Sequence, residues 1–280
     1  MSDNSRLSEQ ASYPSSQFDI EVYLPNQTEL DRALRYPYDA PAGAYVLDCG
    51  QLRPLRDIGI LAGRTAVLSV GSNRAPVQLQ RKFGKDAVVP VTPATLHDCD
   101  IVHVAMLGYY GAVPCTAFPS KGCHVRLNVA WLDADQLVEM HRTEAVGVAY
   151  DYVRFSEKAV THLEIPEADG YAVPGDTPLF GYNARAGVLN IGDGMPASLP
   201  VIDAEGRQFS SFTQAEAATF VRRLCQHNDA RDHATFVKDI RNDKAARDAI
   251  REMLSEHALF ATNAPWQVIN TECENLDSFL

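Results

Sequence analysis

The residue best suited to chemistry is Glu144, which follows a segment that the sequence predicts to be an amphipathic helix. Leu137, Met140 and Glu144 fall at positions i, i+3 and i+7, so the carboxylate continues the apolar side of this helix. On that side it faces the core or a cleft, where burial disfavours the charged form of a carboxylate and makes it a better general base. The plainer alternative is that Glu144 lies past the helix end and reaches solvent or a neighbouring backbone N–H.

A second candidate feature is the turn Gly71-Ser72-Asn73, which ends the apolar run 66–70. The run predicts a buried strand, and Pro76 suits the first position of a short helix after the turn. Glycine lets the backbone bend so that successive N–H groups converge on a carboxylate or a developing oxyanion. Equally, such a turn is an ordinary strand-to-helix connection in which Ser72 or Asn73 caps the helix.

The segments between these features predict the frame that holds them. Residues 101–110 predict a central strand, and residues 112–118 and 123–131 predict a hairpin around the turn-forming run 119–122. Within the second hairpin strand, apolar residues alternate with polar ones on a period of two. A capping box between Asp133 and Gln136 then predicts a helix that runs to about residue 143.

Further helices and strands are expected toward the two ends of the chain. Residues 20–24 alternate like a strand, and residues 28–34 predict a short helix. A second capping box, from Thr213 to Glu216, opens a helix to about residue 227. Residues 233–258 predict a further helical region that is broken near Asn242.

Composition and charge exclude several classes of protein. The 280 residues are 46% hydrophobic, which is enough for a packed core, and the formal charge of −11 disfavours binding to nucleic acid or to an anionic membrane surface. No apolar run approaches the length of a membrane span, and the first residues do not resemble a signal peptide. The six cysteines contain no Cys-x-x-Cys pair, so we expect a cytoplasmic protein.

Two other kinds of chemistry are weighed and set aside. Cys115 is a potential nucleophile with His103 or His141 as its base, but it lies in a strand-like run, where a free cysteine is usually an inert apolar residue. The ligand-type residues of the segment 97–103 lack the spacing of a zinc site, and the chain has no P-loop and no dinucleotide fingerprint. We therefore expect neither a metal nor an organic cofactor.

Taken in order, the motifs resemble those of the γ-glutamylcyclotransferase-like family over roughly residues 65–190. The resemblance rests on the strand followed by Gly71-Ser72-Asn73 and a helix, the run 111–122, the run 132–137, and Thr143-Glu144 followed by a strand that contains tyrosine. It implies an α+β fold, a small closed or nearly closed mixed β-barrel with flanking helices. Around it we expect a disordered leader (1–18), an N-terminal arm packed on the core (19–64), the barrel (65–200), a helical C-terminal extension (201–260) and an extended acidic tail (261–280).

The resemblance also implies an activity. Members of this family convert a γ-glutamyl amine or peptide to 5-oxoproline and a free amine without a cofactor. The family's acid/base glutamate matches Glu144, and its substrate-gripping turn matches residues 70–73, here Val70, Gly71, Ser72 and Asn73. Tyr150, on a predicted strand, is a further residue expected to line the cavity. Two positions depart from the family pattern, because Val70 stands where the family has tyrosine and Ala145-Val146 follows the glutamate where many members have glycine.

A non-catalytic module on the same fold is the alternative. Such a protein would bind a small ligand or a protein partner, and the C-terminal helices would supply the partner surface or a surface for self-association. Catalysis predicts that Glu144 lines a pocket within reach of the amides of Gly71–Asn73. A binding module predicts a filled barrel or a Glu144 that is turned away.

Overall fold

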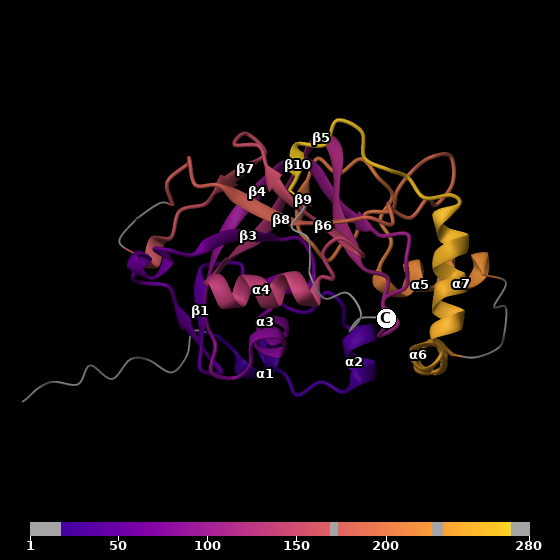
Figure 1. The fold of residues 1–280 in the computed structure, drawn as a ribbon, viewed down its shortest axis with the longest axis horizontal. Helices are drawn as coiled ribbons and strands as arrows, with labels where there is room; N and C mark the ends of the chain where they lie inside the picture. Colours follow the sequence, from indigo (N-terminus) through magenta and orange to yellow (C-terminus); the bar gives the residue numbers. More distant parts are fainter. Residues whose placement is uncertain (1–17, 169–172, 226–231, 270–280) are drawn as a thin grey trace, which may run out of the picture.

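The computed structural model describes residues 18–168, 173–225 and 232–269 (Figure 1). All of the predicted leader except Phe18, and residues 270–280 of the predicted tail, lie outside the described residues. The chain has an α+β fold in which ten strands form one sheet. These strands are β1 (Tyr45–Asp48), β2 (Gln51–Pro54), β3 (Thr65–Ser69), β4 (Val88–His103), β5 (Cys115–Leu132), β6 (Tyr150–Phe155), β7 (Val160–His162), β8 (Leu179–Ala184), β9 (Ala204–Glu205) and β10 (Trp266–Val268).

The sheet is mixed, and it is open. Its strand order is β10-β6-β8-β3-β5-β4-β1-β2, with β7 paired to β4 and β9 paired to β5. The pair β3–β8 is parallel and the other strand pairs are antiparallel. Among the described strands, β10 and β2 are the two ends of this path, so the closed barrel is a wrong expectation. The edge strand β2 is short and carries exposed Arg53 and a final Pro54, which has no N–H to donate, and such features prevent further pairing.

The hairpin predicted around residues 119–122 is also wrong. Strand β5 continues through this run, and the residues on both sides of it pair with β4: Cys115–Pro119 with Cys99–His103, and His124–Ala130 with Val91–His97. The turn-forming residues instead make an irregularity in the β4–β5 pairing, opposite the β4 segment between His97 and Cys99. Asp98 (φ +52°) and Gly122 (φ +78°) adopt left-handed backbone angles there. There the Asp98 Oδ1 atom accepts a hydrogen bond of 2.7 Å from the Gly122 amide. Turn residues within a strand can therefore mark a bulge rather than its end.

Two short helices lie near the start of the chain, and each packs against a different apolar core. Helix α1 (Ile20–Tyr23) occupies the segment expected to be a strand, because Asp19 caps it by accepting from the Glu21 amide at 2.9 Å. The expected short helix at 28–34 is confirmed as α2 (Glu29–Leu34), whose capping box joins Thr28 and Asp31.

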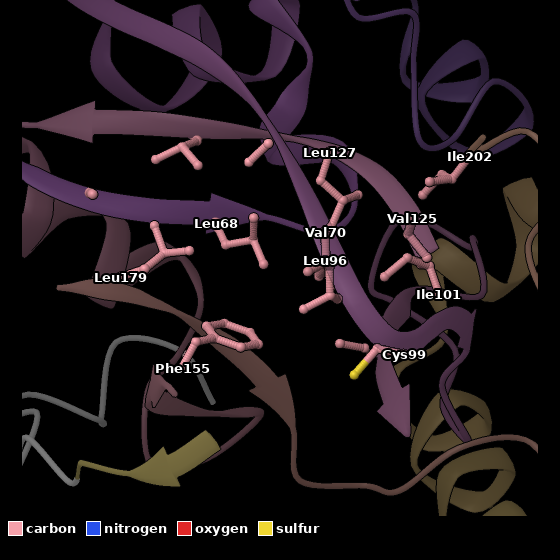
Figure 2. Packing of buried hydrophobic residues seen from close by; sticks show 14 of the residues in the cluster. Leu68, Val70, Leu96, Cys99, Ile101, Val125, Leu127, Phe155, Leu179 and Ile202 are labelled. Carbon is pink, nitrogen blue, oxygen red and sulfur yellow. The ribbon is translucent and has the colours of Figure 1, made fainter. Parts of the chain in front are cut away.

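Alternate residues of the central strands supply two apolar cores, one on each face of the sheet. Leu68 belongs to one core and its neighbour Val67 to the other. Figure 2 shows the first core, where Leu68, Leu96 and Phe155 approach one another from three different strands. The predicted apolar face of 123–131 is confirmed, because its alternate residues Val125, Leu127, Val129 and Trp131 all belong to this core.

The C-terminal helices lie at one end of the sheet (Figure 1). They are α5 (Gln214–Leu224), α6 (His233–Asn242) and α7 (Lys244–Ser255), which confirms the capping box at Thr213 and the break after Asn242. Helix α6 approaches the β4–β5 connection closely, since a Cβ atom on Gly111 (φ +89°) would lie 2.9 Å from the Val237 side chain. None of the helices in the described residues has the length and apolar character needed to cross a bilayer.

Candidate functional site

Two neighbouring helices carry the charged groups of the site. Helix α3 (Pro76–Phe83) begins with the proline that the sequence assigns to its first position, and α4 (Ala134–Thr143) begins at the predicted Asp133–Gln136 capping box. The two helices contact each other and lie side by side in Figure 1. Glu144 is the C-terminal cap of α4, so it lies at the helix end while its side chain turns back toward α3.

The Glu144 carboxylate is held from two directions. Asn73 Nδ2 donates a hydrogen bond of 2.9 Å to Glu144 Oε1, and the Lys82 ammonium forms an ion pair with the same oxygen. The side chains of Lys82 and Glu144 are only 5% and 13% exposed, so water screens this pair weakly. Lys82 Nζ also donates to Thr143 Oγ1 at 2.9 Å, which fixes the end of α4 against α3. Within the described residues Glu144 Oε2 has no partner, so this oxygen is available to a ligand.

Gly71 is required for space. A Cβ atom at this position would lie 2.7 Å from the Tyr36 hydroxyl and 3.0 Å from Cys115 Sγ. The turn is therefore pressed against these two side chains, and a larger residue would displace it.

The turn offers free backbone donors. Residues Ser72–Arg74 form a single 3-10 turn, in which the amides of Arg74 and Ala75 donate to the carbonyls of Gly71 and Ser72. In contrast, the N–H groups of Gly71, Ser72 and Asn73 donate to no other group in the described part of the chain. Successive free N–H groups in one turn are a binding site for a carboxylate or an oxyanion.

Three tyrosines that are partly or fully buried lie within electrostatic reach of the carboxylate. Burial raises the pKa of Tyr150 and Tyr110 well above the ordinary value, and the negative charge of Glu144 raises each further. The pKa of Tyr182 is raised for the same two reasons. These phenols stay protonated at neutral pH, so they act as hydrogen-bond donors and not as bases.

The side chain of the residue before the turn lies in the apolar core. The Val70 side chain packs into the first apolar core (Figure 2), and its carbonyl accepts a weak hydrogen bond from Cys115 Sγ at 3.5 Å. A tyrosine hydroxyl is nevertheless present at the turn, because Tyr36 reaches it from the N-terminal part of the chain. Its oxygen accepts from the Cys115 amide at 3.0 Å and lies 3.3 Å from Cys115 Sγ.

The structure thus brings together Gly71, Ser72, Asn73 and Glu144, with Tyr150 within electrostatic reach, while Val70 turns into the core. Sequence reasoning missed Lys82 and Tyr36. Lys82 is visible in sequence only as one cation in the last turn of α3, and Tyr36 lies far from every motif residue.

Cys115 does not have the surroundings of a nucleophile. Burial raises the pKa of its thiol to about 12, so the thiolate is scarce at neutral pH. The two histidines considered as its base have other partners, since His103 Nε2 bonds the Phe212 carbonyl at 2.8 Å and His141 Nδ1 bonds the Tyr182 hydroxyl at 2.8 Å.

Comparison with known proteins gives structural neighbours alone. No family model matches this chain, and no curated protein matches it. An uncharacterised protein from Homo sapiens has a similar solved structure, with a TM-score of 0.33 and 12% identity over 69% of this chain and 98% of that chain. A solved gamma-glutamyl cyclotransferase gives a TM-score of 0.32 and 11% identity over 69% of this chain and 99% of that chain. The family that the motifs resemble is thus represented among the structural neighbours, but what the site does must follow from its own geometry.

Proposed function

We propose that this protein is a γ-glutamyl cyclotransferase-type enzyme that converts a γ-glutamyl amine or peptide to 5-oxoproline and a free amine. The observation that carries the proposal is the hydrogen bond between Asn73 Nδ2 and Glu144 Oε1, at 2.9 Å. It joins a turn with free amides to a carboxylate that comes 71 residues later in the chain. An acid/base group and an oxyanion-binding turn in contact are what this ring closure requires.

The chemistry needs one proton to change nitrogen atoms. Glu144 takes a proton from the α-amine of the substrate through Oε2, and the α-nitrogen attacks the γ-carbonyl carbon. The free N–H groups of Gly71, Ser72 and Asn73 hold the substrate and stabilise the negative charge that develops on the carbonyl oxygen. The bond from that carbon to the leaving nitrogen then breaks as Glu144 returns the proton to this nitrogen.

The reaction balances without a further reagent. Attack within one molecule forms a five-membered ring, so neither a protein nucleophile nor water is consumed, and positioning supplies much of the rate. Within this proposal, residues 65–200 form the catalytic domain and Tyr150 lines the cavity beside the acid/base group. We place the protein in the cytoplasm, where its unpaired cysteines Cys49, Cys99, Cys115, Cys123 and Cys225 would stay reduced.

The Lys82–Glu144 ion pair is the observation that favours the second candidate, a non-catalytic module that binds a small ligand or a protein. A carboxylate neutralised by a buried ammonium is well suited to a fixed structural or ligand-holding role. In this case the C-terminal helices α5–α7 would supply the surface for a protein partner or for self-association.

The test is to detect 5-oxoproline by mass spectrometry after the protein is incubated with a panel of γ-glutamyl amines and peptides. Glu144→Gln removes the proton acceptor and keeps the shape, so we expect a rate loss of about 100- to 10,000-fold. Glu139→Gln is the matched control, since Glu139 lies on the same helix but pairs with Arg142 at the surface. Product from the wild type and from Glu139→Gln, with almost none from Glu144→Gln, is the expected result.

Two outcomes would decide against the proposal. Equal product from Glu144→Gln would assign the base to another residue. Binding of the panel without any product from the wild type would favour the second candidate.

A further inference from the structure

Arg74, the last residue of the 3-10 turn, has no partner for its positive charge. Its guanidinium makes no hydrogen bond and no ion pair with any described residue, and its Nε atom is buried. Arg81 on α3 shows the usual situation, because its guanidinium donates to Gln78 at 2.6 Å and to Gln27 at 2.8 Å. A largely buried guanidinium that lacks any hydrogen-bond partner is rare, because burial without a partner opposes folding.

The surroundings of Arg74 do not neutralise it. Burial lowers the pKa of its guanidinium, while Cys115, Tyr45 and Asp203 act in the opposite direction. Of these groups, Asp203 alone is a carboxylate, and it does not come within ion-pair distance of Arg74. Tyr45 donates its hydroxyl hydrogen to the Arg74 backbone carbonyl at 3.1 Å, which fixes the backbone of the turn and leaves the guanidinium without a bond.

Two more polar atoms of the same short segment are buried without partners. They are Asn73 Oδ1, an acceptor, and Ser69 Oγ, which can donate or accept. Asn73 Oδ1 belongs to the amide whose Nδ2 bonds Glu144, so it suits the N–H of a group that also contacts this carboxylate. Buried polar atoms are usually satisfied, so a donor and an acceptor left open in neighbouring residues indicate a bound molecule with complementary groups.

We infer that Arg74 recognises a carboxylate of the substrate. The inference rests on the proposed function for the identity of that substrate. A γ-glutamyl group carries on one carbon an amine, which suits Asn73 Oδ1 and Glu144, and a carboxylate, which suits Arg74. Two carboxylates are possible sources: the α-carboxylate of the glutamyl group, or a carboxylate on the leaving amino acid or peptide.

Binding measurements test the inference without depending on turnover. The probes are glutarate and 5-oxoproline, which carry carboxylates, and the uncharged 5-oxoproline carboxamide. Calorimetry measures the affinity of each probe for the wild type and for three variants, Arg74→Gln, Arg74→Lys and Arg81→Gln. A hydrogen bond to a charged group is lost in Arg74→Gln, so we expect its affinity for the carboxylates to fall roughly 10- to 100-fold. We expect Arg74→Lys to keep part of the preference for carboxylate over carboxamide, and Arg81→Gln to keep all of it.

A melting temperature without ligand separates recognition from structural support. Arg74→Gln removes an unpartnered buried cation, so its melting temperature should equal or exceed that of the wild type. A marked fall would show that the cation supports the fold and would overturn the inference. Failure of the wild type to bind either carboxylate, or equal binding by Arg74→Gln, would overturn it as well.

Kinetics with two substrates identify the source of the carboxylate. A KM that rises in Arg74→Gln for γ-glutamyl ethylamide assigns Arg74 to the α-carboxylate, and a rise confined to γ-glutamylglycine assigns it to the leaving part. If the wild type forms no 5-oxoproline but binds glutarate through Arg74, the inference stands and the cyclotransferase proposal falls. If activity needs Glu144 and is unaffected in Arg74→Gln, the proposal stands and the inference falls.

Discussion

Two arginines of this protein carry buried charge in opposite circumstances. Arg207 donates from Nε to both carboxylate oxygens of Asp100, at 3.0 and 3.1 Å, and from a terminal nitrogen to the Ile202 carbonyl at 2.9 Å. Asp100, which is fully buried, also accepts from Ser198 Oγ at 2.5 Å. We call Asp100, Ser198 and Arg207 the closed charge site. Arg74 has no such partner among the described residues. We use the name open turn for Asn73 and Arg74 together with Glu144, the carboxylate that Asn73 contacts.

The difference separates polar groups that bond one another within the protein from polar groups that remain available to a bound molecule. In the closed charge site, atoms far apart in the chain satisfy one another, which holds β4 to the segment between β8 and β9 and to the segment after β9. In the open turn the carboxylate is held by Asn73 and Lys82 through one oxygen, while the amides and the guanidinium remain free. Satisfied networks make a structure rigid, and unsatisfied ones are expected at functional sites.

The largest effect is expected when the closed charge site is broken. Arg207→Met leaves Asp100 buried without its cation, and we expect the free energy of unfolding in urea to fall by about 3–5 kcal/mol. Arg53→Met is the control, because Arg53 is 63% exposed in its pair with Asp48 and should cost at most about 1 kcal/mol. Equal losses in the two variants would mean that the closed charge site contributes no more than a surface pair.

A smaller loss is expected at the open turn, where one ion pair supports the carboxylate. Lys82→Met removes this pair and the bond to Thr143, and we expect it to lower the free energy of unfolding by about 1–3 kcal/mol. Lys82→Arg keeps the charge and should recover part of this loss. A Lys82→Met protein as stable as the wild type would show that Asn73 alone suffices to hold Glu144.

The smallest effect concerns pH and His103, which lies on β4 three residues after Asp100. Burial lowers the pKa of His103 below its ordinary 6.5, although its hydrogen bond to the Phe212 carbonyl acts in the other direction. Below pH 6.5 the unfolded chain therefore binds a proton at His103 more readily than the folded chain does. The contribution of neutral His103 to the free energy of unfolding is complete above pH 6.5, and it is lost as the pH falls below the pKa of His103 in the unfolded chain. One such group gives a slope of at most about 1.4 kcal/mol per pH unit.

Urea unfolding between pH 5 and 7 measures this slope. We expect it to be shallower in His103→Gln than in the wild type, and unchanged in the control His257→Gln at the exposed end of α7. The lowered pKa values of His97, His141 and His162, each caused first by burial, add slopes of the same sign in every variant. An identical pH dependence in His103→Gln would contradict the assignment.

Local features were predictable from sequence where one short motif determines them. Both capping boxes, at Asp133 and Thr213, form as expected, because each needs only two side chains three residues apart. Pro76 opens α3 for an equally local reason. In contrast, the residues 119–122 signal a turn on their own, and they form a bulge instead because the segments on both sides of them pair with the same strand, β4.

The arrangement of the candidate site was predictable in part. The helical spacing that places Glu144 on the apolar side of its helix agrees with its contact to Asn73, since a side chain on the opposite side could not reach the turn. Lys82 could not be assigned, because its role arises only when α3 and α4 pack together. The contact of Tyr36 with the turn and the lack of a partner for Arg74 depend on residues that are distant in sequence, so no local pattern could predict them.

The position of Tyr36 also bears on how this protein can be divided. A shortened chain that begins at residue 65 would contain every motif residue from Gly71 to Glu144, yet it would lack the ring that lies against Gly71 and the hydroxyl that accepts from the Cys115 amide. Side chains around such a gap relax into it only partly, and the rest remains as an empty volume beside the turn. A fragment chosen by its motifs would therefore have an altered turn, because the segment that carries the motifs is shorter than the part of the chain that forms the site.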